Sequence, residues 1–247
     1  MLREEEGKME CQEGFEEVLP GQIEARSFEI IGEELARRGI CLKPEEEPVI
    51  KRAIHATADF DYASSLVFAP GGIDAGLKAL KRGAAVVTDT NMAKAGINKR
   101  KLESLGGHVF CFMADEDVAE RARKMGCTRA AASMEKAAAL FGKGAAALFG
   151  KRAEGGERGA MGNAVNRRPV IVAVGNAPTA LAALCRMIRE GSFLPDLVVG
   201  VPVGFVNVVQ SKELLLAQDK VPYIVARGRK GGSSVAAAVV NALLYQV

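Results

Sequence analysis

The stretch PVIVAVGNAPTA, residues 169 to 180, indicates how this chain folds. Its first seven residues are apolar almost throughout, and three of them are valines, which is typical of a strand buried on both faces. Gly175, Asn176 and Pro178 then end the strand and begin a helix. Backbone N–H groups at this helix start, with Asn176 and Thr179, could hold a carboxylate or a phosphate; ordinary capping explains the same residues almost as well.

The alternation of apolar run and helical pattern recurs along the chain. It implies right-handed βαβ crossovers, and therefore a single α/β domain with a mainly parallel central sheet covered by helices on both faces. The remaining strands are expected at 65–69, 84–89, 108–113, 197–201 and 222–226. Helices are expected at 73–82, 98–104, 116–125, 129–149, 177–190, 208–218 and 233–245.

Glycine, proline and polar residues cluster where these strands end. Ligands of such sheets bind beyond the carboxyl ends of the strands, so these segments are the expected binding site. They are APGG (69–72), TDTNM (88–92), GNAPTA (175–180), GVPVGF (200–205) and RGRKGGSS (227–234).

Composition excludes several classes of protein. The chain has 247 residues, 49% apolar and 26% charged, and its net charge of +3 is spread over scattered basic residues, which argues against nucleic-acid binding. Five cysteines without a CxxC pair argue against a disulfide framework and a structural zinc site. The acidic N-terminus lacks an apolar core, and no run of about 18 apolar residues follows. We therefore expect a cytoplasmic protein without a membrane segment.

Two segments differ in composition from the rest. Residues 1–18 form an acidic extension that we expect to be flexible, followed by the α/β domain at 19–247. A low-complexity insertion is expected at about 141–168, where the unit ALFGK occurs twice, at 139–143 and 147–151, before a Gly- and Arg-rich stretch. Its role is open.

The stretch RAIHATADFDY (52–62) contains one of only two histidines. A helix here would place Arg52, His55 and Asp59, spaced three and four apart, on the side opposite the apolar stripe. His55 could then move protons, with Asp59 orienting its ring, although a solvated polar face without a task explains the spacing equally well.

Two other motifs admit opposing interpretations. RGRKGGSS has the basic and flexible residues that suit an acidic ligand, and a solvated basic turn is the alternative. APGG followed by a helix, with Asp89 placed to hold a ribose, could form a dinucleotide site. The sequence GGIDAG does not match GxGxxG, however, and a tight strand-to-helix turn explains it.

Taken together, the motifs resemble those of the precorrin-8X methylmutases, including the cobalt-precorrin-8 enzymes. Their number, order and spacing over roughly residues 20 to 245 carry the resemblance. They are RSF (26–28), RAIHA (52–56), TDTNM (88–92), TRAAAS (128–133), VGNAPTAL (174–181), GVPVGFV (200–206), QSK (210–212) and RGRKGGS (227–233).

The resemblance implies an isomerase of cobalamin biosynthesis that moves a methyl group from carbon 11 to carbon 12 of a corrin precursor, without a cofactor or a catalytic metal. It assigns proton transfer to His55 and substrate contacts to Ser27 and Arg52. It also implies a homodimer that binds an anionic tetrapyrrole. Further candidates for binding the substrate's carboxylates are Asn91, Arg129, Asn176, Thr179, Arg227 and Arg229.

Two other functions stay open at this stage. A non-catalytic tetrapyrrole carrier would bind the same ligand without needing His55, and a dinucleotide-dependent oxidoreductase would use Asp89. Whether the natural substrate is metal-free precorrin-8X or contains cobalt is also open, because both forms share the motifs.

Overall fold

The computed structural model describes residues 16, 18–142 and 168–247, and the chain divides into two compact units, Met1–Cys41 and Leu42–Val247. The first unit contains the short helix η1 (Pro20–Gln22) and the helix α1 (Ile23–Arg37). The expected extension at 1–18 and insertion at about 141–168 lie almost entirely outside the described residues. The boundaries of the expected domain at 19–247 therefore stay a prediction.

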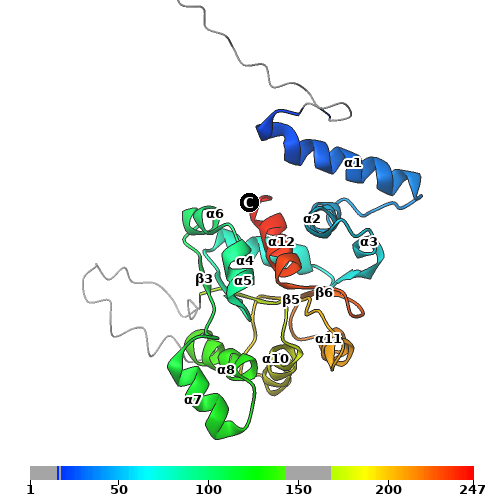
Figure 1. Cartoon of the computed structure of the whole chain (residues 1–247). Coiled ribbons are helices and arrows are strands. Elements are labelled where there is room, and N and C mark those ends of the chain that lie inside the picture. Colours follow the sequence, from blue (N-terminus) through cyan, green and yellow to red (C-terminus); the bar gives the residue numbers. More distant parts are fainter. Residues whose placement is uncertain (1–15, 17, 143–167) are drawn as a thin grey trace, which may run out of the picture. The chain divides into compact units, whose positions relative to one another are not determined.

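The second unit is built on a six-stranded sheet with the order β1-β6-β5-β4-β2-β3 (Figure 1). Five strands run parallel to one another, and β1 at one edge is antiparallel to its neighbour β6. All six expected strands are present. They are β1 (Leu66–Phe68), β2 (Ala85–Thr88), β3 (His108–Phe110), β4 (Val170–Val174), β5 (Leu197–Gly200) and β6 (Tyr223–Ala226).

Helices cover both faces of this sheet, which confirms the predicted fold class (Figure 1). On one face lie α4 (Gly72–Lys81), α5 (Asn91–Gly96) and α12 (Ser233–Leu244). On the other lie α8 (Arg129–Phe141), α10 (Pro178–Glu190) and α11 (Val208–Leu216), with α7 (Glu116–Met125) packed on α8. Among the described residues of this unit, the other helices are α2 (Glu47–Thr57), α3 (Tyr62–Ser65) and α6 (Lys99–Ser104).

The helix α12 joins the sheet to the helix that carries His55. It packs on β4 and β5 on one side and on α2 on the other, so nearly all its side chains are apolar and buried. In return, α2 buries Val49, Ile50, Ala53 and Ile54. Because α2 has only one apolar stripe, the polar residues Arg52 and His55 are left on its other side.

The direction of β1 corrects one sequence expectation. Since β1 is antiparallel to β6, its carboxyl end and the following APGG segment lie at the sheet edge opposite the carboxyl ends of the parallel strands. Its amino end lies instead where the parallel strands end, which we call the carboxyl edge of the sheet. There the backbone N–H of Arg227 donates to Ser65 O at 2.7 Å. APGG is therefore not part of the expected binding edge, and the segment between α2 and β1 takes its place.

A buried carboxylate fastens β2 to β4 at this edge. Asp89 is fully buried, and its two oxygens accept hydrogen bonds from the backbone N–H groups of Gly175 (2.8 Å), Asn176 (2.8 Å) and Ala177 (2.7 Å). Burial raises the pKa of the Asp89 carboxyl, and these hydrogen bonds oppose the rise. Asp89 thus supports the start of α10 and is fully buried, so its carboxylate does not face a ribose and the role that the dinucleotide interpretation gave it is wrong.

Replacing Asp89 with Asn tests this role. The side chain would keep its shape, but one oxygen would become an NH₂ group facing N–H donors, leaving buried groups unsatisfied. We expect Asp89→Asn to lower the free energy of unfolding by about 1–3 kcal/mol in urea denaturation. The control is Asp74→Asn, which removes an exposed Asp74–Lys78 pair and should cost less than about 1 kcal/mol. Equal, small effects in both variants would contradict the role.

Candidate active site

The loops that follow the parallel strands are joined to one another at the carboxyl edge. Thr90 Oγ1 and Ser233 Oγ share a hydrogen bond of 2.8 Å, linking the loop after β2 to the start of α12. The backbone of the loop after β5 bonds to its neighbours on both sides: Val201 N donates to Val174 O (2.9 Å), and Gly232 N donates to Val201 O (2.9 Å). The edge is therefore a connected polar surface rather than a set of independent loops.

Two glycines permit this close approach. A Cβ atom on Gly175 would lie 2.8 Å from Ser233 Cα, and one on Gly231 would lie 2.1 Å from Val201 O. Gly231 also has φ +157°. Side chains at these positions would push the loops after β4, β5 and β6 apart.

Lys212, from the QSK motif, holds the RGRKGGS loop through hydrogen bonds to its backbone. Its side chain is fully buried, and its Nζ donates to Gly228 O and Lys230 O, both at 2.8 Å. Burial lowers the pKa of the Lys212 ammonium to about 8. Both ends of the loop turn are therefore fixed by one side chain, which sequence reasoning had noted only as part of a motif.

The two arginines of this loop have different surroundings. Arg227 lies near Glu213, with Nε 3.6 Å from Oε1, which offsets part of its charge. Arg229 instead places its guanidinium carbon 5.4 Å from the centre of the Phe205 ring. The structure therefore favours Arg229 over Arg227 as the contact for an anionic ligand.

The GVPVGFV motif, expected at the binding site, presents an exposed apolar surface next to Arg229. Phe205 and Val206 are 80% and 77% exposed, although Gly204 N donates to Arg229 O (3.1 Å) and fixes their loop. A backbone that is tied down while it holds large apolar side chains in water is suited to bind an apolar surface. The sequence placed this segment at the binding site but did not show that Phe205 and Val206 are exposed, because apolar residues are usually expected in the core.

The other expected binding residues lie at helix starts on the same edge. Thr179 shares a hydrogen bond of 2.8 Å with Thr128, which joins the starts of α10 and α8. Arg129 is the first residue of α8 and Asn91 the first of α5, and both are exposed, as is Asn176 in the loop before α10. Backbone N–H groups at the start of α8 add positive electrostatic potential there. Those at the start of α10 already donate to the Asp89 carboxylate, so the anion site expected at GNAPTA is filled from within the chain.

His55 lies exposed in the last turn of α2, but the expected grouping with Asp59 on one helix face is wrong. The helix ends at Thr57, and Ala58 adopts the left-handed conformation with φ 54°. Asp59 therefore lies beyond the helix, where its carboxylate contacts Lys230 Nζ at 2.6 Å. Arg52, one turn before His55, places its guanidinium carbon 4.8 Å from the Tyr245 ring centre.

Ser27 belongs to the other compact unit. It lies in α1, where its Oγ donates to Ile23 O at 2.9 Å. Its contact with substrate stays a prediction.

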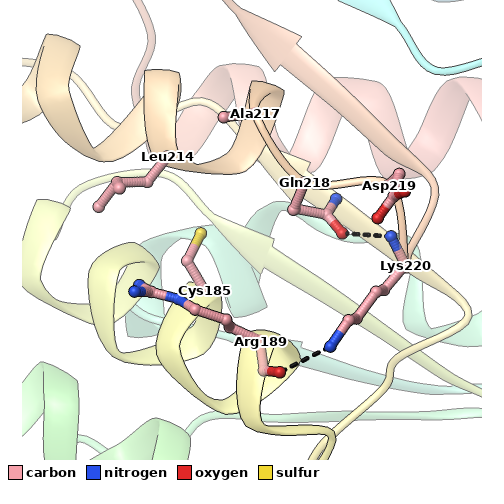
Figure 2. Close-up of a pocket in the computed structure, with 7 residues that line it drawn as sticks. All are labelled: Cys185, Arg189, Leu214, Ala217, Gln218, Asp219 and Lys220. Carbon is pink, nitrogen blue, oxygen red and sulfur yellow. Dashed lines mark hydrogen bonds between the residues drawn. The ribbon is translucent and has the colours of Figure 1, made fainter.

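Two cavities lie away from this edge. One, of about 520 Å³, is bordered by the APGG segment, the start of α4 and Gln246. The other, of about 300 Å³, lies between the end of α10 and the α11–β6 turn (Figure 2). In it Lys220 Nζ donates to Arg189 O at 2.6 Å, and burial raises the pKa of the Cys185 thiol to about 11. A protonated thiol is a weak nucleophile, so the cavity at Cys185 offers no nucleophile.

Within the part of the chain that the structure describes, no three His, Cys, Asp or Glu side chains gather to hold a metal ion. No helix among the described residues is both long and apolar enough to cross a membrane.

The fold is that of an α/β protein, and most of its candidate binding residues lie beyond the carboxyl ends of a mainly parallel sheet. Comparison with known proteins identifies the family. The sequence pattern of the precorrin-8X methylmutases matches residues 22–246. A cobalt-precorrin-8 methylmutase of Priestia megaterium is 42% identical, over 92% of this chain and 88% of the relative. A precorrin-8X methylmutase of Pseudomonas aeruginosa is 36% identical, over 90% and 93%.

A solved structure agrees with these sequences. The precorrin-8x methyl mutase of Thermus thermophilus matches with a TM-score of 0.73 and 38% identity, covering 91% of this chain and 95% of that one. The chain belongs to the precorrin-8X methylmutase family, as its motifs indicated. It is an enzyme of the isomerase class that acts in cobalamin biosynthesis, which favours catalysis over the carrier hypothesis.

The pH dependence of stability tests the burial of Lys212. Its pKa of about 8 in the folded chain lies below the ordinary value of about 10.4 expected on unfolding. Between these values the unfolded chain holds more protons, so the contribution of Lys212 to the free energy of unfolding rises with pH. We expect the native protein to gain stability relative to Lys212→Met between about pH 7.5 and about pH 9.5, measured by urea denaturation. A difference that stays constant or falls would contradict the lowered pKa.

Proposed function

We propose that this enzyme moves a methyl group from carbon 11 to carbon 12 of precorrin-8X or cobalt-precorrin-8, giving hydrogenobyrinate or cobyrinate, with His55 transferring the proton. One observation carries the proposal. The segment between the His55 helix and β1 is joined to the loop that carries Arg229 by a hydrogen bond and an ion pair. Arg227 N donates to Ser65 O (2.7 Å), and Lys230 Nζ contacts Asp59 (2.6 Å). A proton donor and an anion contact are thereby held at one edge.

The chemistry of the rearrangement suits a histidine. The product has the same atoms as the substrate, so the enzyme need not supply or remove electrons. Protonating the ring C nitrogen would weaken the conjugation that holds the methyl group at carbon 11. Histidine is the side chain whose ordinary pKa allows it to give and take a proton near neutral pH. His55 is exposed in the last turn of α2, where a substrate can reach it.

The substrate's shape matches the rest of the edge. A corrin precursor has flat apolar faces and several acetate and propionate arms. We assign contact with a ring face to Phe205 and Val206, and contact with a carboxylate arm to Arg229 beside them. The proposed contacts for other arms are Ser27, Arg52, Asn91, Arg129, Asn176, Thr179 and Arg227.

We also propose that the enzyme works in the cytoplasm as a homodimer with its active site near the subunit interface. The composition and the family resemblance support both statements. Sedimentation equilibrium at micromolar concentration is expected to give twice the mass of the 26.1 kDa chain. A monomer alone at that concentration would contradict the dimer.

Substitution of His55 tests the proposed function. We expect His55→Ala to lower the rate of methyl migration by about 10²–10⁴-fold, because that is the usual contribution of a positioned acid. Binding should be largely preserved, since the other proposed contacts remain. Methyl migration is followed by NMR on labelled precorrin-8X and cobalt-precorrin-8, and binding by the absorbance of the macrocycle.

Arg52→Ala is the comparison variant in the same assay. It removes a proposed carboxylate contact and should therefore weaken binding as well as rate. A His55→Ala protein that rearranges either substrate within a few-fold of the native rate would show that His55 is not the acid. Loss of binding in His55→Ala to the same extent as in Arg52→Ala would indicate a contact rather than a proton donor.

A further inference from the structure

Lys230 joins two distant parts of the chain at the proposed active site. It lies in the loop after β6, between Arg229 and Gly231. Its Nζ contacts the carboxylate of Asp59 at 2.6 Å and that of Asp61 at 2.5 Å, across 169 residues of sequence in the case of Asp61. Both aspartates belong to the turn that leaves the His55 helix. We call these three residues the Lys230 cluster.

The turn itself places the two carboxylates. The Asp59 N–H donates to Thr57 Oγ1 at 3.2 Å, and the Asp61 N–H donates to Asp59 Oδ1 at 3.0 Å. Thr57 Oγ1 in turn donates to Ala53 O at 2.8 Å, within α2. The end of α2 is thus linked to Asp59 by ordinary hydrogen bonds, and the Asp59 carboxylate contacts Lys230.

The loop that carries Lys230 is also fixed from its other side. Lys212 Nζ donates to the carbonyls of Gly228 and Lys230, and Gly204 N donates to Arg229 O. The Lys230 cluster is therefore a bridge between two ordered segments. One carries His55, and the other carries Arg229 with its neighbour Phe205.

Lys230 and Asp59 each favour the charged form of the other, but the Lys230 cluster contributes little to folding stability. The two carboxylates, Asp59 foremost, raise the pKa of Lys230, and the Lys230 ammonium lowers the pKa of Asp59. The side chains are 48% (Lys230), 30% (Asp59) and 69% (Asp61) exposed. Exposed ion pairs contribute little to folding because water competes with them. Removing the cluster should therefore change geometry more than stability.

We propose that Lys230 is a positioning residue for catalysis, which sets the distance between His55 and Arg229 by holding Asp59 and Asp61. This inference rests on the proposed function of His55. A misplacement of about 1 Å between a reacting group and its acid can cost on the order of 10²-fold in rate. Lys230 does not itself bind the substrate, because two carboxylates already compensate its charge.

The test compares Lys230→Met with the native enzyme in the methyl-migration assay with precorrin-8X and cobalt-precorrin-8. We expect kcat to fall at least about tenfold while KM changes less than about threefold, since the acid is displaced but the substrate contacts remain. Lys230→Arg should restore most of kcat, because a guanidinium can also bridge two carboxylates. Urea denaturation should give nearly the native midpoint for both variants.

A second variant tests whether Lys230 acts through Asp59. If it does, Asp59→Asn should lower kcat in the same way, and the double variant Asp59→Asn, Lys230→Met should be little slower than either single variant. The matched control is Lys78→Met on α4. It removes the exposed Lys78–Asp74 contact of 2.5 Å, which is as long as the Lys230–Asp61 contact. It should leave kcat and KM unchanged.

Several outcomes would overturn the inference. A Lys230→Met kcat within twofold of native would show that the bridge has no positioning role. A raised KM with native kcat would make Lys230 a substrate contact instead. Failure of Lys230→Arg to restore kcat, or independent effects of Asp59→Asn and Lys230→Met, would separate Lys230 from the aspartates. His55→Ala in the same assay separates the two proposals: if it is inactive while Lys230→Met is native-like, only the positioning role fails.

Discussion

The arrangement of the carboxyl edge depends on one buried interaction, between the Asp89 carboxylate and three successive backbone N–H groups at the start of α10. Burying a carboxylate is costly, and here its hydrogen bonds oppose that cost. The interaction fixes the loop after β4 against the end of β2. Gly175 then allows α12 to begin within contact distance, and α12 in turn carries α2 on its outer side. The position of His55 thus follows from contacts that begin in the core.

The reversed direction of β1 has the next largest consequence. A parallel β1 would take the segment after α2 to the far edge of the sheet. Because β1 is antiparallel, this segment instead meets the loop after β6, through the Arg227–Ser65 hydrogen bond and the Lys230 cluster. The same reversal moves APGG to the opposite edge, next to the 520 Å³ cavity. One strand direction therefore decides which polar motifs share a site.

The sequence predicted what depends on local pattern. Buried strands such as β4 are valine-rich and apolar throughout, and helices such as α10 show a clear stripe, so both were found. The helix α5 is too short to show a period, and the direction of β1 leaves no local trace. The error at Asp59 arose because Ala58 is a strong helix former that here ends the helix in a left-handed conformation. The contacts of Lys212 and Lys230 with loops and turns depend on the tertiary fold, and no spacing rule could reveal them.

The central claim is that the macrocycle binds at the carboxyl edge, between His55 and the loop of Phe205 and Arg229. The most direct measurement is a crystal structure of the enzyme with its rearranged product bound. The account predicts the ring face in van der Waals contact with Phe205, a carboxylate arm on Arg229, and the His55 imidazole within hydrogen-bond distance of a ring nitrogen. A product bound in the cavity beside APGG, away from His55, would contradict it.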